Sequence, residues 1–246
     1  MPPRHAGAVL DQDEEWCEVE IDGRRRRIRL HDYAAIYNIP GLYEQLFADR
    51  LECTSPEVVC DLLDGALEDA GRDPAAMAVL DFGAGNGMIG DGLARSGFNT
   101  IVGVDLLPEA RAAALRDRPE VYEDYFVLDL TELSSGERTA LTAYDFDCLV
   151  CVAALGFGDV PQRAFVEAFN AVGSPGWLAF NLRDRILEEE QAGGFGALVE
   201  RMCSEGVIEE RTRTRYTHRI SIAGEPLEYV AIVAEKRRDI PLDWLD

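Results

Sequence analysis

The stretch that decides the fold reads Val79-Leu80-Asp81-Phe82-Gly83-Ala84-Gly85-Asn86-Gly87-Met88-Ile89-Gly90. Its first residues predict a short buried strand, and its glycines lie where that strand turns into a helix. Because glycine has no Cβ, such a turn lets a ligand approach the backbone closely. In an open α/β sheet this turn lies at the carboxyl edge of the strands, where ligands bind.

The sequence around this stretch alternates between strand and helix patterns. Five apolar runs are typical of strands, at residues 78–82, 99–106, 125–130, 146–155 and 175–182. The segments between them carry helix signals, including Pro108 and Pro161 near two helix starts. This order predicts a parallel sheet with helices on both faces.

The end of the chain breaks the alternation. Residues 211–222 and 227–237 both resemble strands, and only residues 223–226 connect them. A connection this short leaves no room for a helix, so the two strands must be antiparallel. We therefore expect an α/β fold: a Rossmann-like, doubly wound sheet of seven strands, mostly parallel, with a C-terminal antiparallel hairpin.

Three parts are expected along the chain: a tail with a β-hairpin (1–30), a helical lid packed on the core (31–75) and the Rossmann-like domain (76–246). Alternation on both sides of Asp22-Gly23 predicts the hairpin, a short β-ribbon. Its arginines, residues 24–27, indicate a solvated strand face. Within the lid, Ser55 is expected to cap a helix that stops at Gly71.

The composition limits the partners. There are 24 Lys+Arg against 46 Asp+Glu, a net charge of -22. Nucleic-acid binders need a basic surface, so a DNA or RNA substrate is disfavoured. No apolar run approaches a membrane span, and the N-terminus lacks the apolar core of a secretory signal, so we expect a cytoplasmic protein that contacts no membrane. The oligomeric state is left open.

Two of the six cysteines, Cys148 and Cys151, form a CxxC pattern. They lie within an apolar run that predicts a buried strand. Residues three apart on a strand point to opposite faces, so the pair is not expected to converge on a metal. We expect buried thiols, no disulfides and no metal site.

The glycines alone leave two cofactor classes open, because Gly85, Gly87 and Gly90 also satisfy the G-x-G-x-x-G pattern of dinucleotide sites. Acidic residues at three strand ends favour a different ligand. Asp81 would repel a pyrophosphate but suits an ammonium group, and Asp105 suits ribose hydroxyls. Asp129 ends the third strand in the same manner. An adenosine ligand with a cationic amino-acid tail would use all three acids.

Here the sequence resembles class I S-adenosylmethionine-dependent methyltransferases. The segment 81–87 matches the first motif of that family, while VGVD at 102–105 and VLDL at 127–130 are similar to its second and third motifs. The resemblance spans roughly residues 77–182 and implies S-adenosylmethionine as cofactor. The cofactor-binding residues that we expect are Asp81, Gly83, Ala84, Gly85, Asp105, Leu106, Asp129, Leu130, Val152 and Tyr37. In this resemblance Asp81 holds the amino group, Asp105 the ribose, and Asp129 the adenine.

The methyl acceptor is poorly specified by the sequence. The exit of the fourth strand, residues 151–157, carries no acid, base or metal ligand and predicts a small, partly hydrophobic acceptor. The segment 31–37 resembles the lid of many small-molecule methyltransferases, which makes Tyr33, Tyr37 and Phe157 the expected substrate lid. Plain packing of the N-terminal helices on the core is the alternative for the tyrosines.

No catalytic signature is evident in the sequence. His31 is the best-placed candidate base, although a surface or capping role suits it better. His218, among arginines, is expected on a solvated strand face.

Three functions remain open. The first is an active methyltransferase that modifies a small-molecule acceptor, by O- or N-methylation. The second is a catalytically silent S-adenosylmethionine-binding regulatory protein. The third is an NAD(P)-dependent oxidoreductase, which the C-terminal hairpin and the lack of a second catalytic constellation disfavour.

Overall fold

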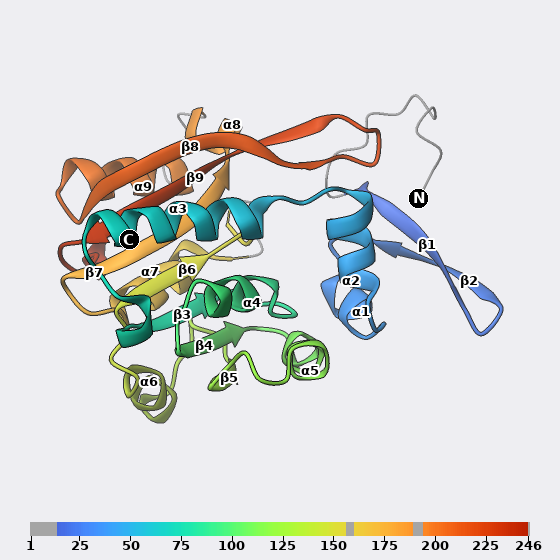
Figure 1. Ribbon diagram of the computed structural model, residues 1–246, viewed down its shortest axis with the longest axis horizontal. Coiled ribbons are helices and arrows are strands. Elements are labelled where there is room, and N and C mark those ends of the chain that lie inside the picture. The colour runs from blue at the N-terminus through green and yellow to red at the C-terminus, as the bar shows by residue number, and fades with distance from the viewer. Residues whose placement is uncertain (1–13, 156–159, 189–193, 246) are drawn as a thin grey trace.

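The computed structural model describes residues 14–155, 160–188 and 194–245, and its core is a seven-stranded sheet covered by helices (Figure 1). Its strands are β3 (Ala78–Phe82), β4 (Thr100–Asp105), β5 (Asp124–Val127), β6 (Cys148–Cys151), β7 (Gly176–Arg183), β8 (Ile208–Ile220) and β9 (Pro226–Lys236). Their order is β5-β4-β3-β6-β7-β9-β8. The neighbours from β5 to β7 pair in parallel, whereas β9 is antiparallel to both β7 and β8. The predicted fold class is confirmed.

The helices form a layer on each face of the sheet. They are α3 (Ser55–Asp69), α4 (Met88–Arg95), α5 (Pro108–Asp117), α6 (Ser135–Thr142), α7 (Gln162–Asn170), α8 (Asp184–Glu188) and α9 (Phe195–Ser204), with short 3-10 turns at Pro74–Ala76 and Leu242–Leu245. Apolar residues of α3 and α4 share one core cluster with the sheet, and those of α6, α7 and α9 share the other. The sheet is therefore buried on both sides, which explains why its central strands are apolar at successive positions.

Strand β6 shows this two-sided burial at the cysteine pair. Cys148 belongs to the cluster under α3 and α4, and Cys151 to the cluster under α7 and α9. Both thiols are fully buried, and burial raises the pKa of each above its ordinary value. The pair thus lies on opposite faces of one strand, as its spacing predicts.

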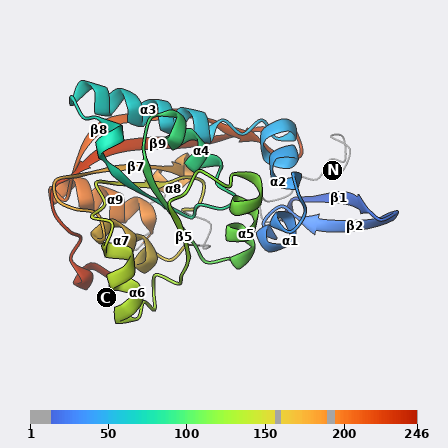
Figure 2. The same cartoon turned by 60° about the horizontal axis from the view of Figure 1, so that its bottom comes forward.

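The N-terminal region lies beside the carboxyl end of the sheet. It consists of the ribbon β1 (Trp16–Ile21) and β2 (Arg24–Arg29), the helices α1 (Tyr33–Tyr37) and α2 (Leu42–Glu44), and a π-helix (Gln45–Arg50) that continues α2. In both views the ribbon extends away from the body of the molecule, next to α1 and α2 (Figure 2). The arginines at 24–27 are exposed, as expected of a solvated strand.

The two parts of the segment 31–75 pack against different parts of the molecule. Helices α1 and α2 and the π-helix form a separate apolar cluster with the ribbon, whereas α3 packs on the sheet itself. The expected cap of α3 was wrong: Thr54 occupies the N-cap position, and Ser55 is a buried residue of the first turn. The boundaries at 30 and 75 stay a prediction. Within the described ranges, no helix combines the length and apolarity that a membrane crossing requires.

Candidate active site

The glycine loop between β3 and α4 has a backbone conformation that residues with a Cβ rarely adopt. Gly83, Gly85 and Gly87 have φ values of +73°, +56° and +88°, in the left-handed region that favours glycine. The loop is fixed to the neighbouring strand because the amides of Gly83 and Ala84 both donate to the carbonyl of Val104, at 2.8 and 3.2 Å. The result is a rigid, open backbone cradle at the carboxyl edge of the sheet.

The third glycine of the dinucleotide-like pattern has a packing role. A Cβ at Gly90 would lie 2.5 Å from the hydroxyl of Tyr122. That glycine therefore makes room for a tyrosine of the core and faces no ligand. This contact explains the third glycine of the pattern without a pyrophosphate.

Asp105, at the end of β4, supports the cradle directly. Its Oδ2 accepts from the amide of Gly85 and its Oδ1 from that of Leu107, both at 2.9 Å. Burial raises the pKa of its carboxyl above the ordinary value, although these amides counteract the effect. The side chain lines a cavity of about 460 Å³, together with the exposed Leu106.

Asp81 is placed differently from Asp105. It is 1% exposed, and its Oδ2 accepts from the Tyr122 hydroxyl at 2.7 Å. Within the described chain, its buried Oδ1 has no hydrogen-bond partner. Burial raises the pKa of Asp81 to about 7, more than the Tyr122 hydrogen bond lowers it. Asp81 lies beneath the glycine loop and is not among the residues that line the cavity.

The third expected acid lies beyond its strand. Asp129 is exposed two residues after β5, and its Oδ1 accepts from both the amide and the hydroxyl of Thr131, at 2.8 and 2.7 Å. These bonds lower its pKa. Asp129, the buried Leu130 and the buried Val152 all line the cavity. Their cofactor contacts stay predictions, as do those of the other residues of the loop.

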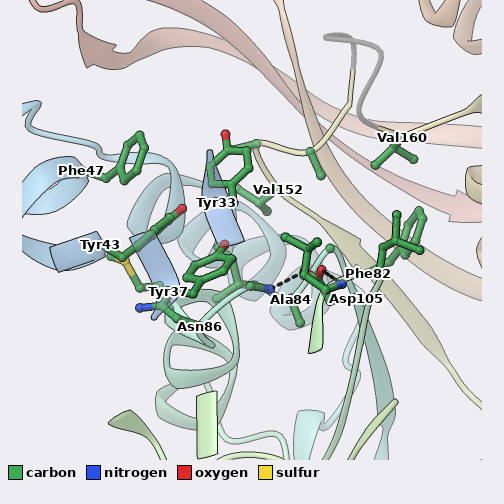
Figure 3. Close-up of a pocket in the computed structure, with 18 of the residues that line it drawn as sticks. Tyr33, Tyr37, Tyr43, Phe47, Phe82, Ala84, Asn86, Asp105, Val152 and Val160 are labelled. Carbon is green, nitrogen blue, oxygen red and sulfur yellow. Dashed lines mark hydrogen bonds between the residues drawn. The ribbon is translucent and has the colours of Figure 1, made fainter. Parts of the chain in front are cut away.

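Four aromatic rings from the N-terminal region line the cavity beside the glycine loop (Figure 3). Tyr33 and Tyr37 lie on one face of α1 and stack with ring centroids 6.1 Å apart. Tyr43 contacts Tyr37 at 5.3 Å and Phe47 at 4.6 Å. The Tyr37 hydroxyl comes so close to the loop that a Cβ at Gly85 would lie 2.6 Å from it. Tyr37 thus lies against the loop with Tyr33 stacked on it, and their role as a substrate lid stays a prediction, whereas Phe157 lies outside the described residues.

Polar contacts fasten this aromatic cover to the core. Glu44, at the end of α2, accepts from Asn86 of the glycine loop at 2.6 Å and from Arg118 at 2.9 Å. Arg116 donates to the carbonyl of Tyr37 at 3.0 Å. We call the Glu44–Asn86–Arg118 group the lid latch. It connects the N-terminal helices to the loop that forms the floor of the cavity.

The expectation for His218 was wrong. This residue is 5% exposed, stacks on Tyr229 at 4.2 Å and lines the same cavity. Its Nδ1 lies 2.6 Å from Ser55 Oγ and 3.7 Å from Cys53 Sγ. Burial, assisted by the adjacent charge of Arg219, lowers the pKa of His218 to about 3, so its imidazole is neutral at neutral pH.

The arginine-rich pattern around His218 concealed its burial. Side chains along β8 alternate between the two faces of the sheet. Bulges in the β8–β9 pairing, between Glu210 and Thr212 and between Thr217 and Arg219, change which side chains face inward. The amide of Thr54 also donates to the His218 carbonyl at 2.9 Å, so the start of α3 closes over this end of β8. No local pattern in the sequence encodes that contact.

His31, the candidate base from the sequence, also lines the cavity and is half-buried. Its ring meets that of Tyr33 edge-on at 5.8 Å. In the described part of the chain, no three His, Cys, Asp or Glu side chains come together as a metal site. Of the two histidines that line the cavity, His218 is the more deeply buried.

Comparison with known proteins places this geometry in a family. Residues 54–207, more than half of the chain, match the model of a family described as a methyltransferase domain. A search of curated proteins found no match.

Solved structures share the fold at low sequence identity. The N-methyltransferase NodS from Bradyrhizobium japonicum, in complex with S-adenosyl-L-homocysteine, is 16% identical with a TM-score of 0.56 over 84% of this chain and 97% of that one. Magnesium protoporphyrin IX methyltransferase from Synechocystis, with bound S-adenosylmethionine, is 12% identical with a TM-score of 0.51 over 74% and 79%. A candidate RNA methyltransferase from Pyrococcus horikoshii is 15% identical with a TM-score of 0.53 over 72% and 81%. The chain therefore belongs to the methyltransferase-domain family, and its resemblance to class I S-adenosylmethionine-dependent methyltransferases is confirmed.

Proposed function

We propose that this protein transfers a methyl group from S-adenosylmethionine to a small-molecule acceptor, on oxygen or nitrogen. The observation that carries the proposal is one continuous cavity of about 460 Å³. It runs from the glycine cradle and Asp105 to the aromatic cover and His218. A donor site and an acceptor site can share this space.

The residues at the cradle fit the cofactor. The backbone of the glycine loop lines the cavity, and Asp105 presents a half-buried carboxylate beside the exposed Leu106. A carboxylate suits two ribose hydroxyls, and an apolar side chain suits the face of an adenine. When bound, S-adenosylmethionine supplies a methyl group activated by a sulfonium centre.

The contribution of the chain is positioning and exclusion of water. Tyr37 covers the loop at Gly85, and the lid latch holds that cover in place. Holding two reactants in line contributes on the order of 7–11 kcal/mol to lowering a barrier. Such a mechanism needs no dedicated catalytic signature, which agrees with the sequence.

Charge and lining favour a small acceptor over a nucleic acid. The chain has a net charge of -22, which opposes binding of a polyanion. Tyr33, Tyr43 and Phe47 give the cavity an aromatic lining suited to a partly apolar molecule.

Calorimetry tests the cofactor first. We expect S-adenosylmethionine and S-adenosylhomocysteine to bind and NADH not to bind. Transfer of a radiolabelled methyl group is then measured to pooled small phenols and amines, and in parallel to total RNA and total protein. Labelling of RNA or protein alone would contradict the small-molecule proposal, and binding of NADH alone would contradict the methyltransferase activity.

A further inference from the structure

Four polar residues from distant parts of the chain form one buried hydrogen-bonded group at the aromatic end of the cavity. They are Ser55 of α3, Asn181 of β7, and Tyr216 and His218 of β8. Ser55 Oγ lies 2.6 Å from both the Tyr216 hydroxyl and His218 Nδ1. Asn181 donates to Ser55 at 3.1 Å and to Tyr216 at 2.7 Å. Buried polar groups are costly unless satisfied, so this group fixes its members firmly.

The orientation of the group follows from one backbone contact. The amide of Ala153 donates to Asn181 Oδ1 at 2.7 Å, which identifies the amide oxygen. Both hydrogens of the Asn181 amide then point to Ser55 and Tyr216. The two hydrogen bonds that join Tyr216, Ser55 and His218 Nδ1 can be donated in either direction.

The ring nitrogen left for a ligand is therefore Nε2 of His218. If Nδ1 donates to Ser55, Nε2 is an acceptor, and if Nδ1 accepts, Nε2 is a donor. A hydroxyl can pair with either form because it both donates and accepts. A carboxylate pairs only with the donor form, and an ammonium only with the acceptor form.

The charge next to His218 is already compensated. Arg219 donates to Glu15 at 2.6 Å, and the two side chains are 3% and 1% exposed. The second oxygen of Glu15 accepts from the amide of Ile222 at 2.7 Å. The cation next to His218 is thus paired with Glu15 and is not free to bind an anionic acceptor. Its walls are the rings of Tyr33, Tyr43, Phe47 and Tyr229.

We infer that His218 binds and orients the hydroxyl group of an uncharged aromatic acceptor, with Ser55, Asn181 and Tyr216 as the residues that position its ring. The inference rests on the proposed function and specifies its acceptor: a phenol-like molecule held between aromatic side chains, with its hydroxyl at Nε2. It assigns the acceptor site to residues outside the cofactor motifs.

The test uses 7-hydroxycoumarin, a small phenol whose absorption distinguishes its neutral and anionic forms. Its binding is measured with the protein saturated by S-adenosylhomocysteine, at a pH where the free probe contains both forms. We expect binding, with the absorption of the neutral form. His218→Ala should weaken binding of the probe about tenfold, since a hydrogen bond and a ring contact are lost. His218→Gln, which keeps a neutral donor and acceptor, should recover part of that loss.

Two further measurements separate this role from a structural one. Affinity for S-adenosylhomocysteine should stay unchanged in both His218 variants, and Ser55→Ala should weaken the probe by a smaller factor. Thr217→Ala is the control, because Thr217 is an exposed neighbour of His218 that does not line the cavity, and it should leave probe affinity within about twofold.

The outcomes distinguish the inference from the proposed function. Probe binding that is absent in the wild type, equal in His218→Ala, or anionic would overturn the inference while binding of S-adenosylhomocysteine leaves the function intact. Failure of the wild type to bind S-adenosylhomocysteine would overturn the proposed function and the inference with it.

Discussion

The two ends of the cavity are built by different means. At the cradle end, the main groups come from two short stretches of chain, 83–87 and 105–107, and the backbone presents most of them: left-handed glycines, and amides held by Asp105. At the aromatic end, side chains from α1, α3 and β8 line the cavity, and Asn181 of β7 is hydrogen-bonded behind them, an arrangement that exists only in the folded protein. A backbone site can be inferred from a local motif, whereas a site made of distant side chains depends on tertiary packing.

The cradle end should respond most strongly to loss of Asp105. In Asp105→Ala, two partly buried amides lose their acceptor, and the expected ribose contacts disappear with it. We expect affinity for S-adenosylhomocysteine to fall by roughly 100-fold or more, measured by calorimetry.

Asp129→Ala provides the matched comparison. Its carboxylate is exposed and already accepts twice from Thr131, so we expect a loss of only a few-fold. An equal loss in both variants would contradict the difference that we draw between a buried and an exposed acid.

A second prediction concerns the contact between the two ends. Gly85→Ala places a methyl group 2.6 Å from the Tyr37 hydroxyl and strains a φ of +56°. We expect a loss of about 2–3 kcal/mol in the free energy of unfolding, measured with urea.

Gly41→Ala is the control that separates backbone strain from the steric clash with Tyr37. It has a φ of +70° but no atom within 4 Å of the added Cβ, so only the strain of about 1 kcal/mol should appear. Tyr37→Phe should relieve part of the Gly85→Ala loss. If Gly41→Ala and Gly85→Ala destabilise equally, Tyr37 does not press on the loop.

A third prediction uses the raised pKa of Asp81. Because the folded pKa, about 7, exceeds the unfolded value, this carboxyl stabilises the fold at low pH, and that contribution is lost as the pH rises from about 4 to about 7. Asp81→Asn removes the titration and keeps an acceptor for Tyr122.

We therefore expect the variant, relative to the wild type, to gain about 2–3 kcal/mol between pH 5 and pH 8 in urea unfolding. The same variant tests the predicted role of Asp81 at the cofactor amino group. Since Asp81 does not line the cavity, affinity for S-adenosylhomocysteine should change little. A loss comparable with that of Asp105→Ala would restore the role expected from the sequence.

The smallest effect is expected at the lid latch. Glu44→Gln weakens the ion pair with Arg118 but retains an oxygen for Asn86, so stability should fall by less than about 1 kcal/mol. Release of S-adenosylhomocysteine, followed by stopped-flow fluorescence, should become a few-fold faster. An unchanged release rate would indicate that the latch does not restrain the cover.

The sequence predicted the sheet well because its signals are local. Apolar runs, a glycine turn and a connection too short for a helix gave the seven strands and the C-terminal hairpin. Strand ends were less accurate: β5 ends at Val127, and Asp129 is held by Thr131 in a turn instead of by the sheet.

The aromatic end was predicted only in part. Tyr33 and Tyr37 were expected at the cavity because the segment 31–37 resembles the lid of many small-molecule methyltransferases, and both line it. Ser55 resembled an ordinary cap and His218 an exposed residue, because each is buried by the other across 163 positions of sequence. Tyr43 and Phe47 join the cover through a π-helix, which no local pattern announced.

The lid latch has a consequence for turnover. Because Glu44 is bonded to Asn86, the N-terminal cover and the glycine loop form one mechanical unit, and the cover cannot swing aside without loosening the floor on which a nucleoside would rest. Entry of a fresh cofactor and departure of the spent one must then pass through the same rearrangement. We expect that exchange, rather than the chemical step, to set the pace of the cycle.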